Sequence, residues 1–301
     1  MNDAMTLDLS CSLRGRLLKD EPLANYSSWR VGGPADYIYF PADLTDLSTF
    51  LQTLPPQLPL HWLGLGSNTL FRDKGVEGVV IMTQGSLHQL TQPSAQDVRA
   101  EAGVAAAQLA RYTARLGLTG LEFMAGIPGT VGGALAMNAG CFGGETWQFV
   151  SKVETINRYG VIKMRPITDF AVSYRHVVKP DQEWFVAGHF SLLAGSKEKS
   201  LETIRLLLEK RNQTQPTGTA NCGSVFRNPP GNYAGRLIEE CGLKGKELGG
   251  ACVSQKHANF IVNNQTATSS DIEQLIQEVG NVVEQKTGVR LIPEVCIIGR
   301  D

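Results

Sequence analysis

The stretch from Gly126 to Gly140 constrains the fold of this chain most strongly, because five of its fifteen residues are glycine. It reads Gly-Ile-Pro-Gly-Thr-Val-Gly-Gly-Ala-Leu-Ala-Met-Asn-Ala-Gly. Glycine adds little to a packed core, but it lets the backbone turn tightly and approach a ligand closely. A second segment of this kind, Gly64-Leu-Gly-Ser-Asn-Thr69, comes at the end of an apolar run that predicts a strand over 60–65.

Together, the two glycine-rich segments predict a cradle for a dinucleotide. Backbone N–H groups in such turns bind pyrophosphate, and Ser67 and Asn68 add side-chain donors. Neither segment has the G-x-G-x-x-G spacing of the usual dinucleotide fold, and the chain has no G-x4-G-K-[S/T] phosphate loop. Each segment alone is equally consistent with an ordinary tight turn, but their occurrence within one α/β region favours ligand binding.

The spacing of apolar residues around these segments predicts alternating strands and helices. Asp43 is placed to cap the first helix, and the turn Tyr159-Gly160 separates the two strands of a hairpin. The predicted strands cover 35–40, 60–65, 78–82, 153–158, 161–164 and 184–193, and the predicted helices cover 44–54 and 105–116.

The last third of the chain begins after a predicted helix over 201–211, and we place the main domain boundary at 213–219. A strand is predicted over 257–263. Ser270 and Glu273 have the spacing of a capping box, which predicts the start of a long helix that ends at Gly288. A closing strand is predicted over 291–298.

Charge and composition exclude several classes of protein. The 301 residues carry 28 basic and 29 acidic side chains, so no net positive field favours nucleic acid. The six cysteines form no C-x-x-C pair, which indicates free thiols in a reducing compartment. We expect no metal site, because no His, Cys or Asp cluster has ligand spacing. We also expect a cytoplasmic protein with no membrane partner, because Met1–Asp20 has no signal-like core and no apolar run could span a bilayer.

Four further segments could carry chemistry. In Gly223-Ser-Val-Phe-Arg-Asn-Pro229, Ser224 is either a positioned donor or part of an exposed loop, and no nearby base supports a hydrolase nucleophile. In Ser173-Tyr-Arg-His176, Arg175 could clamp an anionic group or lie on the surface. Glu294 interrupts an apolar run, so it is either paired and functional or faces water at a sheet edge. His257 is the first residue of the strand predicted over 257–263.

In combination, these segments resemble the UDP-N-acetylenolpyruvoylglucosamine reductase family, which acts in peptidoglycan precursor synthesis. The matching pieces occur in family order from about residue 25 to the end. They are Arg30-Val-Gly-Gly-Pro-Ala35, Gly64–Asn68, Gly126–Gly133 with Asn138-Ala-Gly140, Ser173–Arg175, Gly223–Pro229, His257-Ala-Asn-Phe260 and Pro293-Glu294.

The resemblance implies an α+β fold. An FAD-binding domain of the vanillyl-alcohol-oxidase type would cover 20–195, as two α/β subdomains divided near 84, and a smaller α+β substrate domain would cover 200–301. The implied catalytic residues are Arg175, Ser224 and Glu294. The implied cofactor contacts are Gly64, Gly66, Ser67, Asn68, Gly126, Ile127, Pro128, Gly129, Gly132, Gly133, Asn138, Ala139 and Gly140. The expected substrate contacts are Tyr174, Arg211, Asn228, Lys244, His257 and Asn259.

The implied reaction is reduction of UDP-N-acetylglucosamine enolpyruvate to UDP-N-acetylmuramate by NADPH through FAD. Arg175 would stabilise the developing negative charge, Glu294 would orient Arg175 or a water or stabilise the enol form, and Ser224 would protonate the second carbon. We expect these small molecules to be the partners of a monomer. The alternatives are a sugar or lactone oxidase of the same fold, which has no need of Ser224 or Glu294, and a non-catalytic flavin-binding or nucleotide-sugar-binding protein.

The chain departs from the family pattern in three places. The connection from Tyr174-Arg175 to Trp184 is short, so the chain resembles the subtype without the tyrosine-bearing loop. Cys296 stands where many relatives have arginine, and Thr214 where some have lysine. Arg227 or Arg211 could supply the missing charge at position 296.

Overall fold

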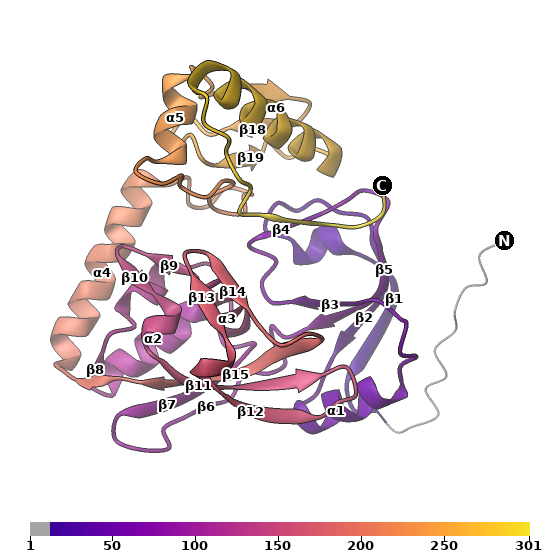
Figure 1. Cartoon of the computed structure of the whole chain (residues 1–301), viewed down its shortest axis with the longest axis vertical. Coiled ribbons are helices and arrows are strands. Elements are labelled where there is room, and N and C mark those ends of the chain that lie inside the picture. Colours follow the sequence, from indigo (N-terminus) through magenta and orange to yellow (C-terminus); the bar gives the residue numbers. More distant parts are fainter. Residues whose placement is uncertain (1–12) are drawn as a thin grey trace.

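The computed structural model describes residues 13–301, which form two sheets with their helices and a C-terminal part that lies across them (Figure 1). The first twelve residues, which include Cys11, lie outside the described part. Among residues 13–301, no helix has both the length and the apolar character needed to cross a membrane.

The first sheet has the strand order β1-β2-β5-β3. Its strands are β1 (Arg16–Pro22), β2 (Pro34–Phe40), β3 (Leu60–Leu63) and β5 (Val76–Met82). α1 (Leu44–Thr53) joins β2 to β3 and begins as predicted at Asp43, whose side chain accepts a hydrogen bond from the backbone of Asp46. The helix packs Leu47 and Phe50 against Tyr39 and Ile81. β1 was not predicted, because its sequence is rich in charged residues. The strand is only partly buried, so it lacks the apolar alternation that indicates a strand.

The second sheet is antiparallel throughout, with the order β12-β11-β15-β7-β6. Its strands are β6 (Leu90–Thr91), β7 (Asp97–Glu101), β11 (Val150–Asn157), β12 (Ile162–Pro166) and β15 (Glu183–Ser191). The predicted hairpin at Tyr159-Gly160 is confirmed. α2 (Ala106–Arg115) and α3 (Val131–Met137) share a core with this sheet that includes Leu109, Leu135 and Phe190.

α3 occupies the middle of the glycine-rich stretch, where no helix was predicted. Thr130 caps it by accepting a bond from the amide of Gly133 at 3.5 Å. A Cβ atom at Gly132 would lie 2.8 Å from that of Ala102, so glycine lets the helix pack closely on the neighbouring backbone. Asn138 ends the helix in the left-handed conformation (φ +46°). In this stretch Gly132 therefore serves close packing, whereas the left-handed turn that ends the helix is made by Asn138.

The C-terminal part is reached through α4 (Lys197–Thr214), which is longer at both ends than predicted because Ser196 caps it and exposed pairs such as Glu202–Arg205 support it (Figure 1). Thr214, its last residue, bonds to the Lys210 carbonyl. This part contains α5 (Ala234–Glu240), β17 (Glu247–Leu248), β18 (Ala251–Val253), β19 (Ile261–Asn263), α6 (Ser269–Thr287) and β20 (Cys296–Ile298). β19 and β20 are shorter than predicted.

The predicted capping box of α6 is wrong by two residues. Thr268 and Asp271 form it, not Ser270 and Glu273. Glu273 instead pairs with Arg72 at 2.8 Å, and Asp73 accepts hydrogen bonds from the amides of Ser269 and Ser270. The start of the helix is thus held by both the local capping box and a long-range contact with Asp73. The prediction that it ends at Gly288 is confirmed.

The C-terminal part is tied to the loops of the first sheet. β20 pairs in parallel with β4 (Thr69–Phe71), and Trp29 lies in the same core as α5 and α6. The indole Nε1 of Trp29 donates to Ile261 O at 2.7 Å, and Asn263 Nδ2 donates to Trp29 O at 2.8 Å. The remaining strands form short hairpins and pairs: β8 (Leu118–Thr119) with β16 (Leu193–Ala194), β9 (Gly140–Cys141) with β10 (Gly144–Glu145), and β13 (Ala171–Ser173) with β14 (His176–Val178).

Candidate active site

One cleft collects residues from all three parts of the chain. Arg175, Ser224 and Glu294, which are far apart in the sequence, all line it. Other predicted site residues that line it are Ser67, Asn68, Gly126, Ile127, Pro128, Ala139, Gly140, Tyr174, Arg211, Asn228 and Asn259. The structure therefore brings the three residues expected to be catalytic to one place.

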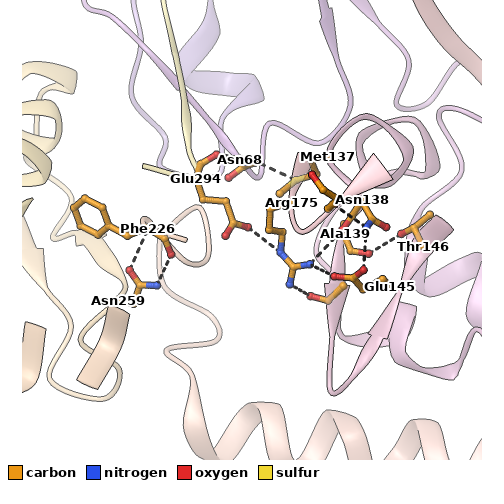
Figure 2. Close-up of polar contacts among 12 residues, drawn as sticks. Asn68, Met137, Asn138, Ala139, Glu145, Thr146, Arg175, Phe226, Asn259 and Glu294 are labelled. Carbon is orange, nitrogen blue, oxygen red and sulfur yellow. Dashed lines mark hydrogen bonds and ion pairs between the residues drawn. The ribbon is translucent and has the colours of Figure 1, made fainter. Parts of the chain in front are cut away.

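Ser224 and Glu294 are brought together by backbone pairing. Glu294 N donates to Val225 O at 2.7 Å, and Arg227 N donates to Ile292 O at 2.9 Å. Buried Asn259 holds the same segment, because its amide group donates to Phe226 O and accepts from Phe226 N (Figure 2). The Ser224 hydroxyl has no hydrogen-bond partner among residues 13–301 and is partly exposed in the cleft. It is free to contact a ligand.

Arg175 lies at the tip of the β13–β14 hairpin with φ +53°, and its side chain is only 14% exposed. Its guanidinium donates to the carbonyls of Asn138 and Gly140, at 3.2 and 2.5 Å (Figure 2). Its Nε lies 3.4 Å from Glu294 Oε1, and its guanidinium carbon lies 4.9 Å from the Tyr174 ring centre. The alternative of a solvated surface arginine is therefore wrong.

Glu294 precedes β20, and its side chain is 12% exposed, so the alternative of an edge residue facing water is also wrong. Burial raises the pKa of its carboxyl group, and the charges of Arg175 and Arg227 only partly oppose this rise. Asn68 Nδ2 donates to the Glu294 carbonyl at 3.1 Å, which fixes the backbone beside a predicted cofactor loop.

Cations other than Arg175 are near the cleft. Arg211 lines it, is half-buried, and donates to Gln215 at 3.2 Å. Burial lowers the pKa of its guanidinium. Arg227 acts on Glu294 through its charge, and its buried Nε has no hydrogen-bond partner among the described residues. These are the two side chains that we expected to supply the positive charge that many relatives have as an arginine at position 296. Here that position is Cys296, which is exposed at the start of β20.

The two glycine-rich loops contact each other. The Ser67 hydroxyl donates to the Pro128 carbonyl, and a Cβ atom at Gly64 would lie 2.3 Å from Thr130 Oγ1. Within residues 13–301, the amides of Gly64 to Asn68 donate to no acceptor. A run of unpaired amides fits an anionic ligand such as the pyrophosphate of FAD. A Cβ atom at Gly66 would lie 2.0 Å from Tyr26 O, so this glycine is required for packing.

Several predicted residues lie outside this cleft. His257 lines an adjoining cleft that Ser224 and Asn228 also line. Gly64, Gly132 and Gly133 line a further cleft beside Trp62. Asn138 is buried and supports the hairpins by donating to Glu145 and Ser173. Lys244 lines none of these three clefts and pairs with Glu239 at 2.7 Å.

Sequence reasoning missed some residues of the main cleft. They are Met137, Cys141, Gln215, Cys222, Gly223, Phe226 and Phe260. Most are next to predicted residues or inside the quoted motifs, which was the available signal. Cys141 is partly buried, and burial raises the pKa of its thiol to about 11. In the described part of the chain, no three His, Cys, Asp or Glu side chains are grouped so that they could hold a metal ion.

Comparisons with known proteins agree with this geometry. The family described as UDP-N-acetylenolpyruvoylglucosamine reductase, C-terminal domain, matches residues 215–298, and the FAD binding domain family matches residues 35–164. A UDP-N-acetylenolpyruvoylglucosamine reductase of Legionella pneumophila (strain Corby) is 57% identical over 287 residues, covering 95% of this chain and 93% of that protein. The protein of that name from Alkalilimnicola ehrlichii is 55% identical over 285 residues, covering 95% of each chain.

The crystal structure of UDP-N-acetylenolpyruvylglucosamine reductase (MurB) from Thermus caldophilus matches with a TM-score of 0.80 at 30% identity, covering 95% of this chain and all of that one. The fold alone is shared with 6-hydroxy-D-nicotine oxidase from Arthrobacter nicotinovorans, at a TM-score of 0.59 and 12% identity, over 95% of this chain and 90% of that one. The predicted α+β fold with an FAD-binding domain of the oxidase type is confirmed. The chain belongs to the UDP-N-acetylenolpyruvoylglucosamine reductase family.

Proposed function

We propose that NADPH is the reductant with which this chain reduces UDP-N-acetylglucosamine enolpyruvate to UDP-N-acetylmuramate, and that Arg175, Ser224 and Glu294 act directly in the reaction. The observation that carries the proposal is that these three side chains line one cleft with both predicted cofactor loops. The two glycine-rich loops would hold FAD, which would supply the hydride chemistry between NADPH and the terminal carbon of the enolpyruvyl ether.

Arg175 would stabilise negative charge. Charge develops on the second carbon of the enolpyruvyl group and spreads into its carboxylate once the terminal carbon is reduced. The guanidinium is already held by Asn138, Gly140 and Glu294, so it needs little reorganisation when that charge forms. A preorganised donor of this kind contributes about 3 kcal/mol to the barrier reduction.

Ser224 would supply the proton. Its hydroxyl has no hydrogen-bond partner among the described residues and borders both the main cleft and the adjoining one. A hydroxyl is a weak acid in water, but transfer from Oγ to a strongly basic carbanion is downhill. The adjoining cleft would give water access to Oγ, so that its proton can be replaced.

Glu294 would orient Arg175 and, when protonated, donate a hydrogen bond to the enol form. Burial favours the protonated carboxyl, which is consistent with this second role. Tyr174, Arg211 and Asn228 would contact the substrate in the main cleft, and His257 would do so in the adjoining one. Asn259 is occupied by the Phe226 backbone and would act by positioning Ser224.

We also propose that the enzyme is a cytoplasmic monomer. One chain supplies Arg175, Ser224 and Glu294, so the cleft needs no residue from a second copy. The scattered cysteines are consistent with a reducing compartment.

The test is to purify the protein, record its flavin absorbance, and follow NADPH oxidation with and without UDP-N-acetylglucosamine enolpyruvate. A yellow protein that oxidises NADPH only when the enolpyruvyl sugar is present supports the proposal. Oxygen consumption with a sugar and without NADPH would support an oxidase instead.

A further inference from the structure

Arg175 lies between two carboxyl groups, and the proposed reaction uses only one of them. Its Nε lies 3.4 Å from Glu294 Oε1, and on the other side its Nη1 lies 3.6 Å from Glu145 Oε1 (Figure 2). Within residues 13–301, these are the only two carboxyl groups that pair with this guanidinium. The Glu145 side chain does not line the cleft with Ser224, so any effect of Glu145 on the reaction would pass through Arg175.

The fold places Glu145 against Arg175 through two hairpins. The β9–β10 hairpin pairs Glu145 with Gly140. Asn138 Nδ2 donates to Glu145 Oε2 at 3.0 Å and to Ser173 O at 3.1 Å, which joins Glu145 to the β13–β14 hairpin that carries Arg175. A Cβ atom at Gly140 would lie 3.1 Å from both Arg175 Nη1 and Glu145 Cγ, so the glycine leaves room for the two side chains to meet.

A guanidinium as buried as that of Arg175 needs a counter-charge, and the two carboxyl groups differ in how well they can supply it. The Glu294 side chain is 12% exposed, whereas that of Glu145 is 31% exposed. Burial raises the pKa of Glu294, and the charges of Arg175 and Arg227 only partly oppose this rise. Glu294 therefore gains a proton more readily than an exposed glutamate does. Water stabilises a charge, and Glu145 has more access to water than Glu294 has.

We propose that Glu145 is a positioning residue that supplies the counter-charge of Arg175, so that Glu294 is free to hold a proton. This inference rests on the roles of Arg175 and Glu294 in the proposed function. Without the charge of Glu145, Arg175 would have Glu294 as its one carboxyl partner among residues 13–301, and the ionised form of Glu294 would become more favourable. The other charged or titratable groups that face the pair are Arg227 beside Glu294, and Tyr174 and Cys141 beside Arg175. None of these three is a carboxylate that could replace Glu145.

The experiment compares Glu145→Gln, which removes the charge and keeps the shape, with Glu145→Asp, which keeps the charge. Gln148→Ala is the matched control. Gln148 is exposed and shares with Glu145 the capping box of the 3-10 helix η3 (Thr146–Gln148), but it does not pair with Arg175. It therefore reports the effect of weakening this turn alone. Rapid mixing of the NADPH-reduced proteins with the enolpyruvyl sugar, over a range of pH, measures the step that Arg175 and Glu294 serve.

The wild-type rate should fall on the alkaline side as Glu294 loses its proton, and in Glu145→Gln this fall should begin at lower pH. Glu145→Gln should match the wild type at the acidic end of the profile and be about 3- to 10-fold slower on the alkaline side. Glu145→Asp should restore the wild-type profile, and Gln148→Ala should not shift it. An unchanged profile in Glu145→Gln, a rate lowered by the same factor at every pH, or an equal shift in Gln148→Ala would overturn the proposal.

Unfolding in urea gives a second readout that needs no turnover, so failure of this inference is distinguishable from failure of the proposed function. The wild type loses stability relative to Glu294→Gln as pH rises above 4.5, because Glu294 ionises at a higher pH in the folded protein than in the unfolded chain. When both proteins also carry Glu145→Gln, this loss should be smaller and should be complete at lower pH. The same pH dependence with and without Glu145→Gln would show that Glu145 does not act on Glu294, whether or not the enzyme turns over.

Discussion

Arg175 Nε lies 3.4 Å from Glu294 Oε1, and this contact joins the β13–β14 hairpin beside the second sheet to the C-terminal segment that carries β20 (Figure 2). Both side chains are largely buried, and Ser224 lies beside Glu294 through the pairing of their backbones. The proposed charge-stabilising group and proton donor are therefore held by different parts of the fold. The site exists only when those parts are assembled.

Replacing Glu294 with glutamine should separate stability from activity. Burial raises the pKa of this carboxyl above its ordinary value of 4.5 in the folded protein. The folded state then binds more protons than the unfolded state between these two pKa values, so the wild type loses stability as pH rises through that window. Glu294→Gln lacks this loss.

We expect the thermal midpoint of Glu294→Gln, relative to the wild type, to be higher at pH 8 than at pH 4.5, while turnover falls about 100-fold or more. Thermal unfolding at several pH values checks the first expectation, and NADPH oxidation the second. A variant that is less stable than the wild type at pH 8 and equally stable at pH 4.5 would show that the carboxylate stabilises the fold.

Replacing Arg175 with lysine should slow reduction of the enolpyruvyl sugar by about 100- to 1000-fold, because a lysine ammonium lacks the planar set of five donors with which the guanidinium contacts two carbonyls and faces the developing charge. Reduction of bound flavin by NADPH should change much less. Rapid mixing of the NADPH-reduced variant with the enolpyruvyl sugar measures the affected step. Arg205→Lys, on the exposed face of α4, is the matched control and should behave as the wild type. A normal rate in Arg175→Lys would remove Arg175 from the mechanism.

The network around Glu154 should make the fold sensitive to acid. The hydrogen bond from Arg99 holds the pKa of Glu154 at about 2, well below its ordinary 4.5, and His189 contributes a contact of 2.8 Å. The stability gained is present above pH 4.5 and is lost as pH falls from there towards 2. Glu154→Gln should be less stable than the wild type by about 2–3 kcal/mol at pH 7, and the difference should shrink through that window. Urea unfolding at pH 7 and at pH 3 measures it, and a difference independent of pH would contradict this explanation.

Asp73 should anchor the C-terminal part to the first sheet. Its two carboxylate oxygens each accept an amide hydrogen bond from the first turn of α6, at 2.9 Å. Loss of a cap of this kind costs about 1–2 kcal/mol, so Asp73→Ala should lower the free energy of unfolding by that amount. Asp73→Asn keeps one acceptor oxygen, so its free energy of unfolding should fall by less than that of Asp73→Ala. If both variants unfold as the wild type does in urea, the contact does not stabilise the assembly.

Regular local signals allowed much of the fold to be predicted. The cap at Asp43 and the glycine at 288 fixed one end of α1 and one of α6. α3 was missed because its glycines lower helix propensity, while its stability comes from the Thr130 cap and close packing on Ala102. The start of α6 was predicted two residues too late. Glu273, which the capping-box rule assigns to the helix start, pairs instead with Arg72, and Asp73 accepts a hydrogen bond from the Ser269 amide; both partners are distant in sequence.

The candidate site was predicted from ordered motifs, not from periodicity. An isolated antiparallel pairing of Phe226 with Pro293 brings Ser224 close to Glu294. No sequence pattern within either segment predicts this pairing. Asn259 was expected to contact substrate, but its amide is occupied by the Phe226 backbone.

The most direct measurement separates the two half-reactions in Ser224→Ala. NADPH should bleach the flavin absorbance of this variant at nearly the wild-type rate, and the bleached protein should then fail to form UDP-N-acetylmuramate from the enolpyruvyl sugar, with a loss of about 100- to 10,000-fold. A folded Ser224→Ala protein that yields product at the wild-type rate, or that loses both steps in parallel, would contradict the role assigned to this hydroxyl.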